Sequence, residues 1–259
     1  MNIFEAIILG VIQGLTEFLP VSSSGHLEIA KAFFGINAES SFSFTVAVHG
    51  ATILSTIIIF WRDIIDLLKG FFKFRMNDEM SYILKILVSM IPVGITGLLF
   101  KDRVEALFSG NIVFVGSMLL VTSVLLLIGH VVKNRNREIG FWDALIMGIA
   151  QSIAVIPGIS RSGATISAGL MLGNRKDEIA RFSFLMVLIP VIGANLLEIV
   201  NGDFNSGSAG ADIIFAGFIS ALVSGCIACK WMISLVKRSK MIWFSAYCAL
   251  AGIISIIAG

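Results

Sequence analysis

Residues 17–26 are Glu17-Phe18-Leu19-Pro20-Val21-Ser22-Ser23-Ser24-Gly25-His26, a polar interruption in a strongly apolar chain. A second interruption follows further along, Pro157-Gly158-Ile159-Ser160-Arg161-Ser162-Gly163-Ala164-Thr165. A shift of 138 positions superimposes several residues of the two regions: Gly10 on Gly148, Gln13 on Gln151, Ser22 on Ser160, Ser24 on Ser162 and Gly25 on Gly163. We interpret the two regions as diverged copies of one segment.

The composition around these segments excludes an ordinary soluble domain. The chain has 259 residues, of which 57% are hydrophobic and 14% charged, and its mean hydropathy is +0.94. A soluble domain of this length needs far more polar surface, and several apolar runs approach the roughly 20 residues that cross a bilayer. The sequence predicts an integral membrane protein with the membrane, and no nucleic acid, as its partner. Polar groups at membrane depth are costly, so both interruptions are interpreted as functional.

The apolar runs divide into six full spans and two broken regions. The spans are expected at about 42–61, 82–100, 111–131, 179–200, 211–231 and 241–258. The broken regions, 2–36 and 142–174, each contain a proline near the middle, which removes a backbone donor and disfavours helix at the preceding residue. Each half has about 12–15 residues, which covers roughly 20 Å and falls short of the roughly 30 Å hydrocarbon core. A re-entrant helical hairpin fits each region better than a span.

The order of these elements predicts an inverted repeat within a single domain, 1–259. Repeat 1 covers about 1–131 and repeat 2 about 142–259, and each has a re-entrant pair followed by three spans. Three is odd, so the second copy lies upside down relative to the first, as in many transporters. The predicted fold is an all-α polytopic membrane protein with six transmembrane helices plus two re-entrant helical hairpins in an inverted-topology repeat.

The basic residues orient this arrangement in the membrane. Most of them fall in loops on one side of the six-span topology: Arg62, Lys69, Lys73, Arg75, Lys133, Arg135, Arg137, Arg175, Lys176, Lys237, Arg238 and Lys240. Because loops rich in lysine and arginine stay in the cytoplasm, both termini and the first hairpin are expected outside. The second hairpin is expected to enter from the cytoplasmic side.

Side chains around the first break suit catalysis. Gln13 and Glu17 are four residues apart and share one helix face. Glu17 lies one turn before the break, close to the polar residues that begin the next half-helix, Ser22, Ser23, Ser24 and His26. A carboxylate, hydroxyls and an imidazole at one junction suit nucleophilic or general acid–base chemistry. In the structural alternative, Glu17 caps a helix or pairs with a lysine.

Both breaks also predict an anion site. Free N–H groups at a helix N-terminus, together with the helix dipole, bind phosphate, and Arg161 adds a planar fork that matches phosphate oxygens. Two such N-termini that converge would cradle a doubly phosphorylated group. The expected binding residues are Ser22, Ser24, Gly25, Ser160, Arg161, Ser162, Gly163 and Thr165. Serines that merely cap short helices are the alternative for some of these, but that alternative leaves Arg161 unexplained.

The two motifs resemble the signature motifs of the bacterial undecaprenyl-diphosphate phosphatase family, also called the bacitracin-resistance family, and the resemblance spans essentially the whole chain. It implies an enzyme of the bacterial inner (plasma) membrane that removes the terminal phosphate of undecaprenyl diphosphate. This recycles the lipid carrier for peptidoglycan synthesis and counters bacitracin. It also implies an active site that faces outside and a divalent cation such as Mg²⁺ or Ca²⁺. By position, the resemblance implies Glu17, Ser23, His26 and Arg161 as catalytic residues, with Ser160 and Thr165 in the second motif.

One departure from the family concerns the cation. Many members carry a glutamate where this chain has Gln13. This chain therefore has only one of the two carboxylates of a Glu-x-x-x-Glu metal site. Glu17 and Gln13 are the expected ligands, and an amide carbonyl is the weaker of the two for a hard cation.

The expected reaction is an in-line displacement at the terminal phosphorus, with Ser23 as nucleophile and His26 as base or leaving-group acid. A water nucleophile, activated by His26 or by a cation at Glu17, stays open as an alternative. A polyprenyl-phosphate flippase or transporter on the same inverted-repeat fold is the alternative function. The oligomeric state is open, a homodimer included.

Overall fold

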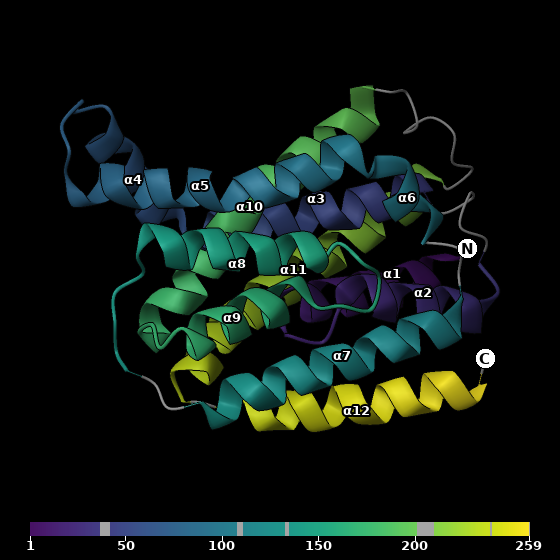
Figure 1. Cartoon of the computed structure of the whole chain (residues 1–259). Helices are drawn as coiled ribbons and strands as arrows, with labels where there is room; N and C mark the ends of the chain where they lie inside the picture. Colours follow the sequence, from purple (N-terminus) through teal and green to yellow (C-terminus); the bar gives the residue numbers. More distant parts are fainter. Residues whose placement is uncertain (37–41, 108–110, 133–134, 201–209, 239, 259) are drawn as a thin grey trace.

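The computed structural model describes residues 1–36, 42–107, 111–132, 135–200, 210–238 and 240–258. Over these ranges the chain forms helices and no strands (Figure 1). In chain order the helices are α1 (Ile3–Phe18), α2 (Ser23–Phe34), α3 (Phe42–Ile59), α4 (Trp61–Phe71), α5 (Asp78–Leu99), α6 (Lys101–Ala106), α7 (Ile112–Val131), α8 (Phe141–Ile153), α9 (Arg161–Met171), α10 (Lys176–Val200), α11 (Ala211–Lys237) and α12 (Met241–Ala258).

Length and composition confirm the prediction of an all-α polytopic membrane protein. In the described part of the chain, five helices (α5, α7, α10, α11 and α12) are long and apolar enough to cross a bilayer. A sixth span results if α3 and α4 are counted together, although α4 turns away from α3 by 72°. The sequence predicted neither α4 nor the short helix α6, and it placed the end of this span at residue 61 rather than at Ile59.

The two broken regions are helix–break–helix segments at the predicted places. α1 ends at Phe18 and α2 begins at Ser23, so the first break contains Pro20. α8 ends at Ile153 and α9 begins at Arg161, so the second break contains Pro157. Helices α1, α2, α8 and α9 have 16, 12, 13 and 11 residues. At about 1.5 Å per residue, none is as long as the hydrocarbon core is thick.

Each first half-helix packs on a helix of the other half of the chain through glycine. A methyl group at Gly10 would collide with the Gly217 carbonyl of α11, and one at Gly148 would collide with the backbone of Ser89 on α5. These two glycines are 138 positions apart. Such close backbone contact is typical of small residues at membrane helix interfaces.

The two breaks contact each other reciprocally. A Cβ atom on Gly25 would lie 3.3 Å from the Cα of Gly158, and one on Gly163 would lie 3.4 Å from the Cβ of Pro20. Gly25 and Gly163, and likewise Pro20 and Gly158, are 138 positions apart. Each contact is therefore the counterpart of the other under the shift found in the sequence. The inverted orientation of the two copies stays a prediction.

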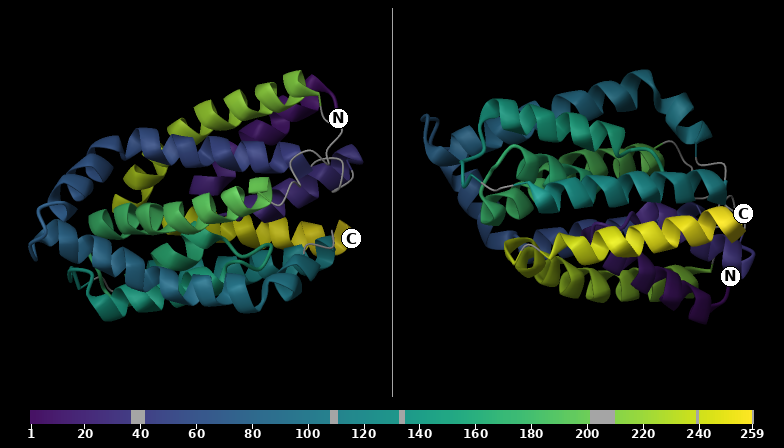
Figure 2. Two further views of the ribbon diagram at one scale, coloured as in Figure 1. Left: turned by 90° about the horizontal axis from the view of Figure 1, so that it is seen from above. Right: turned by 60° about the horizontal axis from the view of Figure 1, so that its bottom comes forward.

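The helices run nearly alongside one another, and the two termini lie at the same end of the bundle (Figures 1 and 2). The turns from α4 to α5 and from α9 to α10 lie at the opposite end (Figure 1). Exposed basic residues of that end include Lys69, Lys73, Arg175 and Lys237. Many basic residues thus lie at the end away from the termini, whereas α6, which carries Arg103, lies at the same end as the termini (Figure 1).

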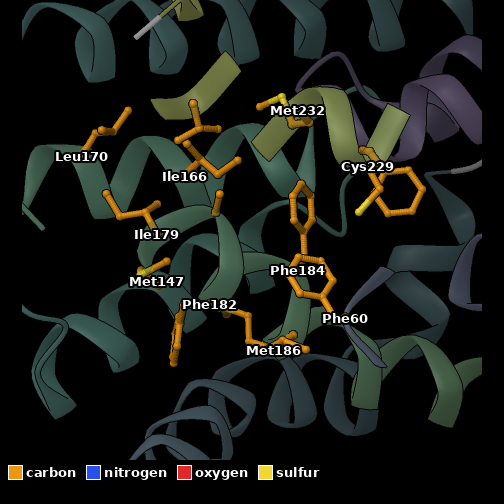
Figure 3. Close-up of a cluster of buried hydrophobic side chains, with 14 of the residues drawn as sticks. Phe60, Met147, Ile166, Leu170, Ile179, Phe182, Phe184, Met186, Cys229 and Met232 are labelled. Atoms are coloured by element: carbon orange, nitrogen blue, oxygen red, sulfur yellow. The ribbon is translucent and has the colours of Figure 1, made fainter. Parts of the chain in front are cut away.

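The largest apolar core lies beside the second broken region. Ile166 and Leu170 of α9 pack there with Ile179, Phe182 and Met186 of α10 and with Met147 of α8 (Figure 3). Phe18, at the end of α1, stacks edge-on against Phe184 of α10, with ring centroids 5.7 Å apart. This core anchors the last turn of α1, which carries Glu17, against the helix that follows the second motif.

Candidate active site

Glu17 is the point at which the two motifs meet. It lies in the last turn of α1, and its carboxylate accepts three side-chain hydrogen bonds. Arg161 Nη2 donates to Oε1 at 2.6 Å, Ser23 Oγ donates to Oε2 at 2.6 Å, and Gln13 Nε2 donates to Oε2 at 2.9 Å. The Glu17 side chain is 12% exposed and that of Arg161 28% exposed. A buried carboxylate at this depth is therefore neutralised by the arginine of the other motif.

The first motif forms a tight N-terminus for α2. Ser22 is the N-cap residue, and its hydroxyl accepts a hydrogen bond from the Gly25 N–H at 3.4 Å. The backbone of Ser22 has φ +68°, a conformation that costs a non-glycine residue about 1–3 kcal/mol and occurs at functional sites. The turn brings Ser23, the first helical residue, back toward Glu17. Ser24 lies alongside, with its hydroxyl 3.4 Å from that of Ser22.

The second motif repeats this geometry at the start of α9. Ser160 is the N-cap residue, and its hydroxyl accepts from the Gly163 N–H at 3.0 Å. The Ser160 and Ser162 hydroxyls are 3.3 Å apart. Ser162 also donates to the Leu19 carbonyl at 3.3 Å, which ties the second motif to the first break. Both new helices thus present their N-terminal N–H groups near the Glu17–Arg161 pair.

Thr165 lies one turn beyond Arg161 and does not contact Glu17 in the described bonds. Its hydroxyl is fully buried and donates to the Arg161 carbonyl at 2.9 Å. It also lies 2.5 Å from the Ser183 hydroxyl of α10. Thr165 therefore holds the helix that carries Arg161, and its expected contact with substrate stays a prediction.

Among the described hydrogen bonds, none joins His26 to Ser23, for which the sequence suggested it as the base. Its Nδ1 lies 2.8 Å from the Ser22 carbonyl, and its Nε2 lies 2.8 Å from the hydroxyl of Tyr247 on α12. Sequence reasoning missed Tyr247 altogether. The imidazole therefore belongs to a second set of hydrogen bonds in the site, separate from the Glu17–Ser23 pair.

A small cavity opens beside the ion pair, on the side of α3 and α10. Its polar lining consists of Glu17 and Arg161 with four hydroxyls, those of Thr52, Thr56, Ser162 and Ser183. The remaining wall is apolar and comes mainly from α10. Its volume, about 30 Å³, holds one or two water molecules and is too small for a diphosphate group.

The side chains at Glu17 offer few free ligands to a divalent cation. Both carboxylate oxygens already accept hydrogen bonds, and Arg161 supplies the positive charge that a metal ion would supply. Gln13 offers only one oxygen, Oε1, which is buried and has no hydrogen-bond partner. No cluster of three or more histidine, cysteine, aspartate or glutamate residues suited to a metal occurs among the residues described. The expected Mg²⁺ or Ca²⁺ stays untested.

Known proteins resemble this chain over almost its entire length. Residues 6–254 match the family model described as "Bacitracin resistance protein BacA". A protein of Parabacteroides distasonis named undecaprenyl-diphosphatase is 51% identical over 260 residues, which cover 99% of this chain and 98% of that protein. Proteins of the same name from Bacteroides fragilis and Christiangramia forsetii are 51% and 50% identical over 261 and 259 residues, again covering 99% of this chain and 98% of each relative. The chain therefore belongs to the bacitracin resistance protein family BacA.

Proposed function

We propose that this chain hydrolyses undecaprenyl diphosphate to undecaprenyl phosphate and inorganic phosphate. The product is the lipid carrier for cell-wall synthesis, and removal of the diphosphate form confers resistance to bacitracin. Family membership and the relatives named undecaprenyl-diphosphatase support the reaction. The observation that carries the mechanism is the Ser23 hydroxyl hydrogen-bonded to Glu17, whose carboxylate also holds Arg161.

The phosphates bind where the two helix N-termini meet. The N–H groups at the starts of α2 and α9 and the hydroxyls of Ser22, Ser24, Ser160 and Ser162 surround the Glu17–Arg161 pair. Such donors stabilise the negative charge of a phosphate and the further charge that develops as it is transferred. Arg161 bonds Glu17 through Nη2, which leaves its other N–H groups for the terminal phosphate.

The first step transfers the terminal phosphate to Ser23. The Ser23 oxygen attacks the terminal phosphorus, and its proton passes to Glu17, the acceptor it already bonds. The Oγ–P bond forms as the bond between that phosphorus and the bridging oxygen breaks. The bond's electrons stay on the bridging oxygen, and undecaprenyl phosphate leaves. Positioning and electrostatic stabilisation supply most of the rate enhancement in such a transfer.

The second step releases inorganic phosphate. A water molecule attacks the phosphorus, and its proton passes to His26 Nε2 through the Tyr247 hydroxyl that hydrogen-bonds this nitrogen, which makes the imidazole the base of the second step. The new O–P bond forms as the bond from Ser23 breaks, and Ser23 recovers its proton from Glu17. The hydrogen bonds of Ser23 with Glu17 and of His26 with Tyr247 support this division of roles.

The site works on a lipid that stays in the membrane. The polyprenyl tail lies in the surrounding hydrocarbon, so the protein needs to enclose only the headgroup. We place the protein in the bacterial inner (plasma) membrane, with the end rich in basic residues in the cytoplasm and, as the family resemblance implies, with its catalytic residues facing outside. A homodimer is compatible with this arrangement.

Phosphate release by the purified protein in detergent tests the function. Wild-type protein releases phosphate from undecaprenyl diphosphate, whereas a flippase or transporter alone would release none, because detergent leaves no two sides. Arg161→Ala should lose the activity while it still expresses and purifies as a folded protein. Ser23→Ala tests the nucleophile. Turnover close to wild type in Ser23→Ala would eliminate the serine mechanism and leave the water alternative.

A further inference from the structure

We propose that Tyr247 is a positioning residue that holds the imidazole of His26 ready for proton transfer. The inference rests on the proposed hydrolysis, because it assigns a partner to His26 within that reaction. Tyr247 lies on α12, the last helix, 221 positions from His26. Neither motif contains it, and nothing in its local sequence marks it as part of a site.

The two nitrogens of His26 have different partners. A backbone carbonyl can only accept, so the contact of Nδ1 with the Ser22 carbonyl at 2.8 Å requires a proton on Nδ1. In the neutral imidazole the lone pair is then on Nε2, which lies 2.8 Å from the Tyr247 hydroxyl. The tyrosine donates this hydrogen bond. It thereby fixes the tautomer whose free base is Nε2, in the way that a second partner commonly fixes a catalytic histidine.

The Tyr247 hydroxyl can hydrogen-bond Nε2 of His26 in both protonation states of the imidazole. When the imidazole is neutral, the Tyr247 O–H donates to Nε2. When Nε2 gains a proton, the same oxygen can turn and accept from it, because a phenol is both donor and acceptor. The two rings stack with an interplanar angle of 14° and centroids 5.6 Å apart. The ring therefore keeps the imidazole plane in place while the hydroxyl follows the proton.

The second copy of the motif carries an apolar pair at the corresponding place. A shift of 138 positions puts Ala164 where the first copy has His26. Ala164 packs in a cluster with Met118 of α7, the third span of repeat 1. α12 is the third span of repeat 2. α7 thus packs on α9, whereas α12 packs mainly on α7 and reaches His26 of α2 through the Tyr247 side chain.

The neighbour of Tyr247 ties α12 to the same break. The thiol of Cys248 donates to the Pro20 carbonyl at 3.6 Å. Adjacent residues of α12 therefore contact the backbone of the first break and the side chain of His26. Tyr247 itself is 46% exposed.

The test is a double-mutant cycle on purified protein with undecaprenyl diphosphate as substrate. Tyr247→Phe should lower kcat about tenfold, the size expected for one lost hydrogen bond of ordinary strength, and leave KM within about twofold of wild type. In a His26→Ala background, Tyr247→Phe should cause no further loss. Tyr82→Phe is the matched control. It removes the hydroxyl of the other of the chain's two tyrosines, and that hydroxyl is buried without a hydrogen-bond partner.

An unchanged kcat in Tyr247→Phe, or equal losses in both backgrounds, would overturn the proposal. Nitrogen NMR of histidine-labelled protein gives a second readout, because the chain has only three histidines and His26→Ala identifies the signal of His26. Tyr247→Phe should shift the Nε2 signal of His26, and an unshifted signal contradicts the proposal. If wild-type protein releases no phosphate, the proposed function fails, and the NMR signal still decides whether Tyr247 sets the state of His26.

Discussion

The Glu17 carboxylate accepts hydrogen bonds from the Arg161 guanidinium and from the Ser23 hydroxyl, the proposed nucleophile. These two partners place opposite demands on its basicity. Arg161 stabilises the negative charge, whereas Ser23 gains from a carboxylate that is basic enough to accept its proton. In the proposed reaction, bound phosphates would compete with Glu17 for the Arg161 guanidinium. A carboxylate released from part of its ion pair becomes the stronger base.

Glu17→Gln should abolish most of the phosphate-releasing activity of the enzyme. The amide has nearly the same shape but cannot take the Ser23 proton, so kcat should fall about 10²–10⁴-fold, the usual contribution of general acid–base catalysis. Phosphate release at saturating substrate measures it. Glu28→Gln is the control, since Glu28 lies on α2 and pairs with Lys31 at 3.7 Å rather than with Ser23. A Glu17→Gln protein that retains a tenth of wild-type kcat would contradict the role of Glu17 as base.

Gln13→Glu should raise the affinity of the enzyme for a divalent cation. The new carboxylate would lie beside Glu17, at the place from which the Gln13 amide now donates over 2.9 Å. Two adjacent carboxylates repel each other unless a cation lies between them. The half-saturating Mg²⁺ or Ca²⁺ concentration should drop about tenfold, the range of effect seen when a metal site gains or loses a supporting group.

Titration of the activity after treatment with EDTA measures that change. Gln151→Glu is the matched control, because Gln151 is the counterpart of Gln13 in the second motif and its Oε1 is also buried without a partner. Equal cation requirements in wild type and Gln13→Glu would show that position 13 does not govern the cation.

The sequence predicted the two motifs because their prolines, glycines and charges are local signals. It could also predict that Glu17 and Arg161 lie close together, since both sit at breaks of a repeated segment. It could not predict that Ser23 bonds Glu17 while His26 turns to Tyr247. Those choices depend on the backbone of the first break, where Ser22 has a positive φ. An exposed tyrosine in an apolar helix has no sequence signal of function.

At the scale of elements, α1 is held to α11 by backbone contact. A methyl group on Gly14 would collide with the Ser224 hydroxyl, the Ala221 carbonyl and the Gly225 nitrogen. Gly14 lies one turn before Glu17, so any shift of α1 at this point also moves the Glu17 carboxylate. The small residues of the first motif region thus connect helix packing directly to the site.

Gly14→Ala should therefore lower both stability and activity. The forced separation of α1 and α11 should cost about 1–3 kcal/mol, as other overpacked contacts do, and kcat should fall because the geometry around Glu17 is disturbed. Thermal unfolding in detergent and phosphate release measure the two effects. Gly94→Ala on α5 makes the same change where no atom lies within 4 Å of the added carbon. Similar losses in both variants would contradict the packing argument.

The long helices were predictable from apolar length, but α4 and α6 were not. α4 carries Asp63 in its first turn and Lys69 in its last turn, which suits the helix dipole. In the sequence, however, its basic residues are interpreted as part of a cytoplasmic loop. The 72° bend that separates it from α3 has no proline at the junction to mark it in the sequence. α6 has six residues, fewer than hydrophobic periodicity can detect.

At the scale of the whole molecule, the two copies of the motif share one framework and differ in chemistry. Both have N-capping serines, paired hydroxyls, and a buried glutamine with an unpartnered oxygen. Glu17 and His26 occur only in the first copy, and Arg161 only in the second. Neither copy holds the catalytic set alone, so the contact between the two breaks is what completes the site.

The orientation of this framework in the membrane can be tested on a single helix. Asp212 lies in the first turn of α11 and Lys237 in its last turn, and both side chains are exposed. Because lysine and arginine gather at the end that carries Lys237, that end should face the cytoplasm. A membrane-impermeant thiol reagent should therefore label Asp212→Cys in intact cells and label Lys237→Cys only after permeabilisation. The wild-type chain, whose three cysteines lie within α11 and α12, gives the background. The reverse labelling pattern would place the catalytic face on the cytoplasmic side, and the substrate would then have to be reached from within the cell.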